Sequence, residues 1–494
     1  MRILYIDIDA LRPDHLSCYG YHRDTSPHID RLAAEGCRFD QLYASDAPCM
    51  PSRTALFSGR FGARTGAVAH AGTVAEPFPE GPGRGFTSNW GRTSWMKKLA
   101  DAGYHTASIS SFGERHSAFH WYAGFREVQN TGGMGMESAE AVTPVALDWL
   151  ERKGPDDHWF LHLNFWDAHT PYRAPESFGN PFADDPLPEW LTEDVRQRHW
   201  EGVGMQSARE RSGYGGKDYY NAAFPRQPAV IDSMDAVRAM FDGYDCGIRW
   251  VDTQIGAILD KLEALGVLDD TAIIVSADHG ENLGELNIYG CHQTADPVTM
   301  RLPCIIRWPG LTTGPGASAP GTDDRLRYHF DFAATVLDLV GADIPKNWDG
   351  QSFAPLLRGE GDTGREHLVL SQGQGSCQRA VRFDDWYYMR SYHDGFRDLP
   401  DDLLWQAHGD PHLLDNRAPD EPGVVARARA LLADWEASVI DPDNGDPLQT
   451  VIAEGGPPHV RGQLEAYVAY LRETGRAAAA DRIAAKHRRQ GAGA

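Results

Sequence analysis

Apolar runs and amphipathic segments alternate over the first 280 of the 494 residues. Four short segments predict strands. Three of them are mostly apolar, as in strands that are buried on both faces; they span residues 2–8, 159–165 and 271–276, and the fourth segment spans residues 105–109. Segments with an apolar period near 3.6 predict helices; they span residues 26–36, 93–103, 137–152 and 236–265. This alternation predicts an α/β fold in which helices flank a large, mainly parallel sheet.

Two regions break this pattern. Residues 173–235 are rich in Pro, Gly, Trp and charge, and we expect so long an irregular insertion to border the substrate pocket. After about residue 360 the chain predicts an antiparallel meander at 367–371, 378–383 and 386–391, helices at 423–438 and 459–474, and a helical tail. We therefore expect a catalytic domain over residues 1–360 and a smaller α+β domain over residues 361–494.

The net charge and the cysteine pattern limit the partners and the cellular location that we expect for the protein. With 47 basic and 70 acidic residues the net charge is −23, and an acidic surface repels phosphate backbones, so we expect no nucleic-acid partner. No apolar run is long enough to predict a membrane span. Seven cysteines without a paired pattern and an N-terminus unlike a signal peptide predict a cytoplasmic location. The formation of a homo-oligomer is compatible with the sequence and is not decided by it.

Polar residues follow three of the predicted strands. Asp9 follows the first, His169 the third, and Asp278 and His279 the fourth. Because parallel strands end at the same sheet edge, we expect these groups to converge. Two carboxylates and one imidazole suit a divalent cation, with calcium expected ahead of manganese or magnesium. Asp7 points the same way along the strand, and is either an outer support of this site or an ordinary buried carboxylate.

The segment CMPSRTALFSGR, residues 49–60, carries the strongest chemical signal. Pro51 fits the first position of a helix and Gly59 its end. Cys49 is then placed at a helix N-terminus, where free N–H groups attract anions. Arg53, one turn later, points back to the same end and suits a sulfate or phosphate. The alternative is a buried cysteine before an ordinary helix.

The motif C-x-P-S-R-x(5)-G-R resembles the signature of the type I sulfatases, in the alkaline phosphatase superfamily. The segments LRPDHLSCYGYHRDTSPHIDRLAAEG, DAHTPY, IRWVDTQIG, DHGENLGE and MRLPCIIRWPG are similar to the family in the same order. The resemblance implies that a formylglycine-generating enzyme oxidises Cys49 to Cα-formylglycine, whose hydrate attacks sulfur. It implies a small sulfated substrate, an aryl or carbohydrate sulfate.

The resemblance also implies roles for individual residues. The metal ligands are Asp9, Cys49, Asp278 and His279, and the catalytic residues are Cys49, Arg53, His169 and His292. We expect Asp278 to accept the nucleophile's proton, and either His169 or His292, with a preference for His292, to protonate the leaving alcohol. Residues expected to bind the substrate are His70, Arg115 and His116.

Several positions depart from the family pattern. Ala10 stands where a second aspartate is common, and Cys291 where a lysine is usual. The K-x-H pair is missing from SISSFGERH, which leaves Arg115 and nearby histidines as replacements. The Asp278-His279 pair resembles phosphonate monoester hydrolases, so a phosphonate monoester or phosphodiester hydrolase is the alternative function, and a non-catalytic anion binder the third. Aromatic residues of the insertion either stack on the substrate or pack the loop; they are Trp190, Trp200 and Tyr214.

Overall fold

A large sheet forms the centre of the protein in the computed structural model, which describes residues 1–80, 89–211 and 223–491. Its strands are β1 (Arg2–Ile8), β2 (Cys37–Tyr43), β4 (His105–Ile109), β5 (Glu127–Gln129), β6 (Trp159–Phe165), β7 (Thr271–Ser276), β10 (Arg301–Arg307), β11 (Thr322–Asp323) and β12 (Arg327–Tyr328). The order is β11-β2-β10-β7-β1-β6-β4-β5, and β12 also pairs with β2.

The four predicted strands form the parallel middle of this sheet. β1 runs parallel to β6 and β7, and β4 continues the parallel set beyond β6. Every residue of β1 is buried, which explains its nearly continuous apolar sequence. On the other side, β10 is antiparallel to both β7 and β2, a pairing that the helix–strand alternation did not predict.

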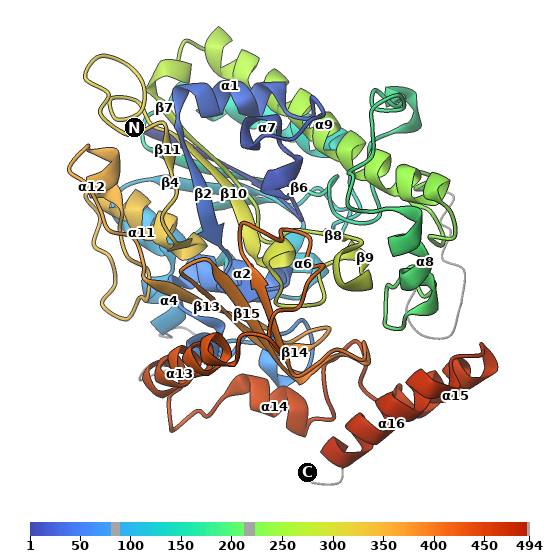
Figure 1. The fold of residues 1–494 in the computed structure, drawn as a ribbon. Helices are drawn as coiled ribbons and strands as arrows, with labels where there is room; N and C mark the ends of the chain where they lie inside the picture. The colour runs from blue at the N-terminus through green and yellow to red at the C-terminus, as the bar shows by residue number, and fades with distance from the viewer. Residues whose placement is uncertain (81–88, 212–222, 492–494) are drawn as a thin grey trace.

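Helices cover both faces of the sheet (Figure 1). One face carries α1 (Pro27–Glu35), α7 (Ala139–Lys153) and α9 (Met234–Ala264); the other carries α2 (Cys49–Ser58), α5 (Trp95–Asp101) and α11 (His329–Leu339). Two of these helices begin at a serine cap. Ser94 accepts a hydrogen bond from the Lys97 backbone N–H, and Ser233 from that of Ala236. Because Ser233 caps it, α9 begins two residues earlier than predicted.

A second, smaller sheet contains the predicted C-terminal meander. Its order is β16-β15-β14-β13-β3, with bounds β3 (Asp46–Ala47), β13 (His367–Gln372), β14 (Cys377–Phe383), β15 (Trp386–His393) and β16 (Asp402–Gln406). β3 pairs in parallel with β13 and directly precedes Cys49. The small sheet therefore supports the segment that carries the sulfatase-like motif. The division of the chain at residue 360 stays a prediction.

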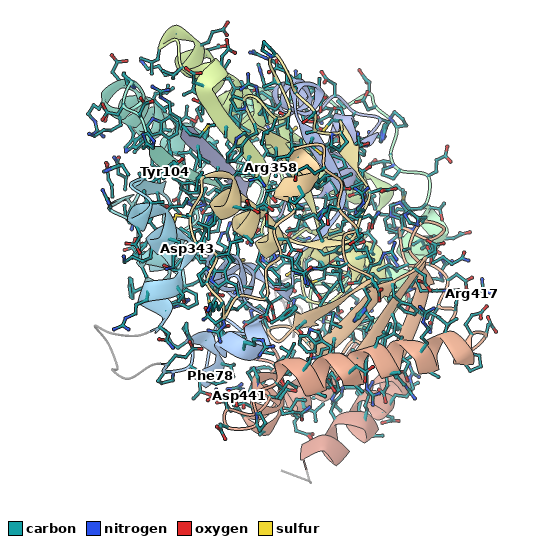
Figure 2. All side chains as sticks on the ribbon, turned by 90° about the vertical axis from the view of Figure 1, so that its left-hand side faces the viewer. Phe78, Tyr104, Asp343, Arg358, Arg417 and Asp441 are labelled. Carbon is teal, nitrogen blue, oxygen red and sulfur yellow. The ribbon has the colours of Figure 1, made fainter. Side chains whose placement is uncertain are left out.

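The C-terminal helices cover the small sheet or extend from it. In Figure 2, α13 (Pro422–Val439) runs across the sheet between the labelled Arg417 and Asp441. It is followed by α14 (Pro447–Ala453), α15 (Leu464–Glu473) and α16 (Ala477–Gly491), of which the last two pack together. The shorter elements are α3 (Gly62–Thr65), α4 (Asn89–Thr93), α6 (Phe112–Arg115), α8 (Glu193–Glu201), α10 (Pro297–Met300), α12 (Ala354–Leu357) and the hairpin β8 (Asn282–Leu283) with β9 (Tyr289–Cys291). Across the described chain, we find no helix with the length and apolar character that a bilayer crossing requires.

Candidate active site

Two carboxylates lie side by side just beyond the ends of β1 and β7. The strands are parallel neighbours with Asp7 opposite Ser276, so Asp9 and Asp278 follow at the same level. Asp278 Oδ1 accepts hydrogen bonds from the backbone N–H groups of Ala10 (3.2 Å) and His279 (2.9 Å). Both carboxylates are buried. The sheet register therefore produces the predicted convergence of acidic groups.

Cys49 faces these carboxylates from the first position of α2, two residues before Pro51. Its Sγ lies 3.0 Å from His279 Nε2, while His279 Nδ1 donates to the Gly280 carbonyl (2.8 Å). Burial, together with the charges of Asp9 and Asp278, raises the pKa of the Cys49 thiol well above its usual value. In the absence of a bound cation, these surroundings favour the protonated thiol, which is a poor nucleophile.

Arg53 binds three carboxylates at once. Its Nε donates to Asp7 Oδ2 (2.8 Å), and its Nη1 donates to Asp9 Oδ2 (3.0 Å) and to Asp278 Oδ2 (2.5 Å). Asp7 also lies 3.2 Å from His162 Nε2. Asp7 is thus a buried, hydrogen-bonded carboxylate that supports the site by anchoring Arg53.

The donor set suits a divalent cation. The ligand atoms of Asp9, Cys49, Asp278 and His279 all lie within 4.8 Å of one another. Asp9 Oδ1 has no hydrogen-bond partner and lies 3.7 Å from His279 Nε2. A buried carboxylate oxygen without a donor is costly, and a bound cation would satisfy it. Where residue 49 is a formylglycine hydrate, as the motif predicts, one of its oxygens takes the place of Cys49 Sγ in this set.

The electrostatics of Asp9 agree with a ligand role. Burial acts to raise its pKa, but Arg53 and the imidazoles of His169, His279 and His292 together lower the pKa below its usual range. Asp9 is therefore ionised at neutral pH. Asp278 differs, because burial and the charges of its carboxylate neighbours raise its pKa well above its usual value against the effect of Arg53.

His169 and His292 lie beside the acidic pair. His169 Nε2 is 3.9 Å from Asp9 Oδ1, and its ring centroid is 5.1 Å from that of His292. The rings of His279 and His292 are 3.9 Å apart. Burial lowers the pKa of His169 well below its usual value; burial and His279 lower that of His292 to about 4. Without a bound ester, these surroundings therefore favour the neutral form of both rings, and an anionic ester bound beside them would favour the imidazolium form that a proton donor needs.

Glu281 is a site residue that the sequence reasoning missed. Its Oε2 lies 3.1 Å from His292 Nδ1, its Oε1 has no hydrogen-bond partner, and the residue is fully buried. The carboxylate holds His292 in the tautomer with Nδ1–H and leaves Nε2 available. The available signal was its place in the motif DHGEN, two residues after His279.

The residues predicted to bind the substrate line one cleft of about 440 Å³ together with Cys49. They are His70, Arg115 and His116. His70 Nε2 accepts the backbone N–H of Met50 (3.2 Å), and the rings of His70 and His116 are 4.4 Å apart. Of the other predicted site residues, His169 and His292 line the same cleft. Asp9, Arg53, Asp278 and His279 do not line it and are buried next to Cys49. The roles of all these residues stay predictions.

The cleft also receives residues that had not been singled out. Gln206, Arg211 and Gln227 of the irregular insertion line it, together with Gln293 and His459. His459 comes from the region expected to form a separate domain, and its Nδ1 lies 2.9 Å from Gln293 Oε1. Residues far apart in the sequence that sit on loops carry no periodic pattern, so only the fold shows that they meet.

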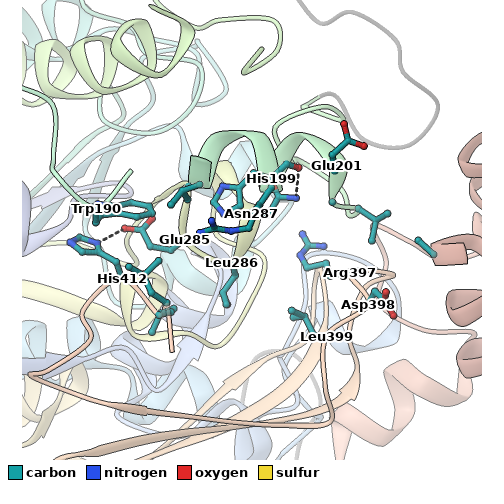
Figure 3. Close-up of a pocket in the computed structure, with 18 of the residues that line it drawn as sticks. Trp190, His199, Glu201, Glu285, Leu286, Asn287, Arg397, Asp398, Leu399 and His412 are labelled. Carbon is teal, nitrogen blue, oxygen red and sulfur yellow. Dashed lines mark hydrogen bonds and ion pairs between the residues drawn. The ribbon is translucent and has the colours of Figure 1, made fainter. Parts of the chain in front are cut away.

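Two tryptophans of the insertion lie outside the cleft beside Cys49. Trp190 stacks on His412, with centroids 4.5 Å apart and ring planes at 12°, in a separate pocket of about 370 Å³ (Figure 3). The guanidinium of Arg209 lies over the ring of Trp200. Neither tryptophan lines the cleft beside Cys49. Trp190 and Trp200 therefore pack against protein side chains instead of lining this cleft. Tyr214 lies outside the described residues.

Comparison with known proteins identifies the family of the chain. The family model Sulfatase matches residues 2–342. The chain is 24% identical to N-acetylglucosamine-6-O-sulfatase of Bacteroides thetaiotaomicron, over 84% of this chain and 82% of that protein. It is 24% identical to choline-sulfatase of Rhizobium meliloti, over 84% of this chain and 83% of that protein. The phosphonate monoester hydrolase of Silicibacter pomeroyi shares the fold, with a TM-score of 0.66 at 21% identity over 89% of this chain and 96% of that one. The family model covers most of the chain, so the protein belongs to the sulfatase family and is a sulfuric ester hydrolase.

Proposed function

We propose that the protein hydrolyses the sulfate ester of an aryl or carbohydrate alcohol with a formylglycine derived from Cys49. The position of Cys49 carries this proposal: it is buried at the start of α2, 3.0 Å from His279 Nε2 and beside two carboxylates. Without a cation, burial and the neighbouring carboxylates raise the pKa of its thiol, and a protonated thiol is a poor nucleophile. An aldehyde hydrate supplies an oxygen nucleophile instead, and can release sulfate by re-forming the aldehyde.

Asp9, Asp278, His279 and the modified residue 49 would hold one divalent cation, for which we propose calcium because carboxylate oxygens dominate the set. When bound, such a cation polarises the sulfate and offsets its charge. Arg53, fixed on the same carboxylates, would contribute positive charge to the transferred group. Asp278, whose carboxylate lies in the same cluster of ligand atoms as Cys49, is our candidate to accept the proton of the attacking hydroxyl.

His292 is our first candidate for the group that protonates the leaving alcohol, and His169 the second. Glu281 supports this order, because a carboxylate 3.1 Å from Nδ1 stabilises the imidazolium form of His292. His169 instead places a ring nitrogen near the Thr170 carbonyl, without a carboxylate at that side. His70, Arg115 and His116 would bind the sulfate from the cleft wall.

A phosphonate monoester or phosphodiester hydrolase is the second candidate function. His279, where many sulfatases have asparagine, favours it. The test is the ratio of kcat/KM for 4-nitrophenyl sulfate to that for 4-nitrophenyl phenylphosphonate, measured on protein produced with a formylglycine-generating enzyme. We expect the sulfate to react faster. A faster phosphonate would reverse the two proposals, and no turnover of either by modified protein would reject both.

Two further proposals concern the setting of the protein. A formylglycine-generating enzyme is its proposed maturation partner. We propose the cytoplasm as its location, which agrees with seven cysteines that all stay unpaired.

A further inference from the structure

Arg211 is a buried arginine in the cleft that pairs with no carboxylate of the described residues. It is 7% exposed and lines the cleft beside Cys49. Its Nη1 donates to the Tyr289 carbonyl and lies 3.4 Å from Met240 Sδ, while its Nε has no hydrogen-bond partner. Within the described ranges, no carboxylate forms an ion pair with it. Burying a guanidinium without an anion is costly, so a missing anion is the simplest explanation for this arrangement.

The acidic groups nearest to Arg211 are engaged elsewhere. Glu210, its neighbour in sequence, pairs with Arg476. Glu281 attracts the guanidinium at longer range, but its carboxylate binds His292. Burial lowers the pKa of Arg211, because these surroundings do not fully compensate its charge.

The loop that carries Arg211 is fixed by its own hydrogen bonds. The Gln206 carbonyl accepts the Tyr289 backbone N–H (2.8 Å), and the Ala208 N–H donates to Asn287 Oδ1 (3.1 Å). The Ala208 carbonyl accepts the Ile231 N–H (2.9 Å). A charged group on such a fixed loop is pre-organised, and binding a ligand there costs little ordering.

The rest of the cleft wall suits an anionic, hydrogen-bonding molecule. No aspartate or glutamate is among the lining residues in the part of the chain that the structure describes. Arg115, on α6, lines the cleft as well and donates to the Met134 carbonyl (3.1 Å). Gln206 and Gln227 add amide groups from the insertion. The cleft is thus locally cationic in a protein of net charge −23.

We propose that Arg211 binds a second anionic group of the substrate, so that the preferred substrates are sulfate esters that also carry a carboxylate or another sulfate. This inference rests on the proposed function. Arg53 is held by three carboxylates next to Cys49 and belongs with the ester sulfate. Arg211 has no such partner in the described part of the chain, and a guanidinium pairs with a carboxylate or sulfate through two parallel hydrogen bonds.

The test uses substrates that share a leaving group. 4-Nitrophenyl sulfate is compared with its two analogues that carry a carboxylate at ring position 2 or 3. We expect the modified wild-type protein to favour at least one analogue by about tenfold or more in kcat/KM. Equal or lower kcat/KM for both analogues would overturn the inference while leaving sulfate ester hydrolysis intact. No turnover of any of the three esters would instead reject the proposed function.

Three variants assign the preference to Arg211. We expect Arg211→Gln to abolish it, with less than about threefold change on 4-nitrophenyl sulfate itself. Arg211→Lys keeps the charge and should retain part of the preference. Arg209→Gln removes a charge two residues away, outside the cleft, and should leave the preference unchanged. A preference that survives in Arg211→Gln, or an equal loss on all three esters, would show that Arg211 only anchors Tyr289. If Arg211→Gln does not fold, Arg211→Lys is the deciding variant. An undiminished preference of Arg211→Lys for the carboxylate analogues would contradict the inference.

Discussion

At the scale of single residues, the site combines groups that the sequence could name with groups that it could not. Asp9, Cys49 and Asp278 stand at strand ends or in a dense motif, so their residue type and spacing pointed to chemistry. Arg211 stands in an irregular loop, and its unpaired charge becomes visible only once the partners of its neighbours are known. Sequence reasoning therefore finds groups by motif, and misses those defined by what surrounds them.

The proton donor can be identified from the dependence on the leaving group. We expect His292→Ala to slow alkyl or sugar sulfates by about 100-fold or more, and 4-nitrophenyl sulfate much less, because a basic alkoxide needs the proton most. His169→Ala should slow both kinds alike. The measurement is kcat on the two classes of ester for both variants. Equal losses in both variants would move the search for the acid to His70 and His116.

Glu281 should matter through His292. Glu281→Gln keeps the size of the side chain but removes the carboxylate that lies 3.1 Å from Nδ1. We expect kcat on alkyl sulfates to fall by about 10-fold to 100-fold with little change in KM, because the imidazolium loses its stabilising partner. If His292→Ala is made first, adding Glu281→Gln should cost little more. Additive losses in the double variant would contradict a shared role.

At the scale of elements, the parallel strands and their helices were predictable because most of the strands are short apolar runs and the helices have an apolar period near 3.6. β3 has only two residues and no periodicity, yet it joins the small sheet to the start of α2. The sequence of the antiparallel β10 is apolar in the same way as that of the buried parallel strands, so its direction could not be predicted. Most helix ends were predicted to within a few residues from the apolar period, and the caps at Ser94 and Ser233 set the actual starts of α5 and α9.

The contact between α9 and the loop before His169 gives an element-scale prediction. A Cβ on Gly247 would lie 2.3 Å from the Asp167 carbonyl oxygen, whereas one on Gly423, in α13, meets nothing within 4 Å. We expect Gly247→Ala to lower the free energy of unfolding by about 1–3 kcal/mol and to reduce activity by displacing His169. Gly423→Ala is the matched control and should not be destabilised. Denaturant unfolding of both variants checks this, and equal stabilities would contradict the tight contact.

At the scale of the whole molecule, the site joins the two sheets: β1 and β7 bring the carboxylates, and β3 leads into Cys49. A cation held by residues from separate elements stabilises the folded state that presents them together. We expect removal of divalent metal by a chelator to abolish activity and to lower Tm, and added calcium to restore both. Asp9→Asn should show a smaller calcium response of Tm. Full activity after exhaustive metal removal would contradict the metal proposal.

The central claim is that residue 49 is a formylglycine in the active enzyme. The most direct measurement is mass spectrometry of the peptide that contains Cys49, on protein produced with and without a formylglycine-generating enzyme, with sulfatase activity measured on the same samples. We expect an aldehyde at residue 49, activity in proportion to the aldehyde fraction, and essentially no activity in Cys49→Ala. Full activity in a preparation that contains only intact cysteine at this position would contradict the claim.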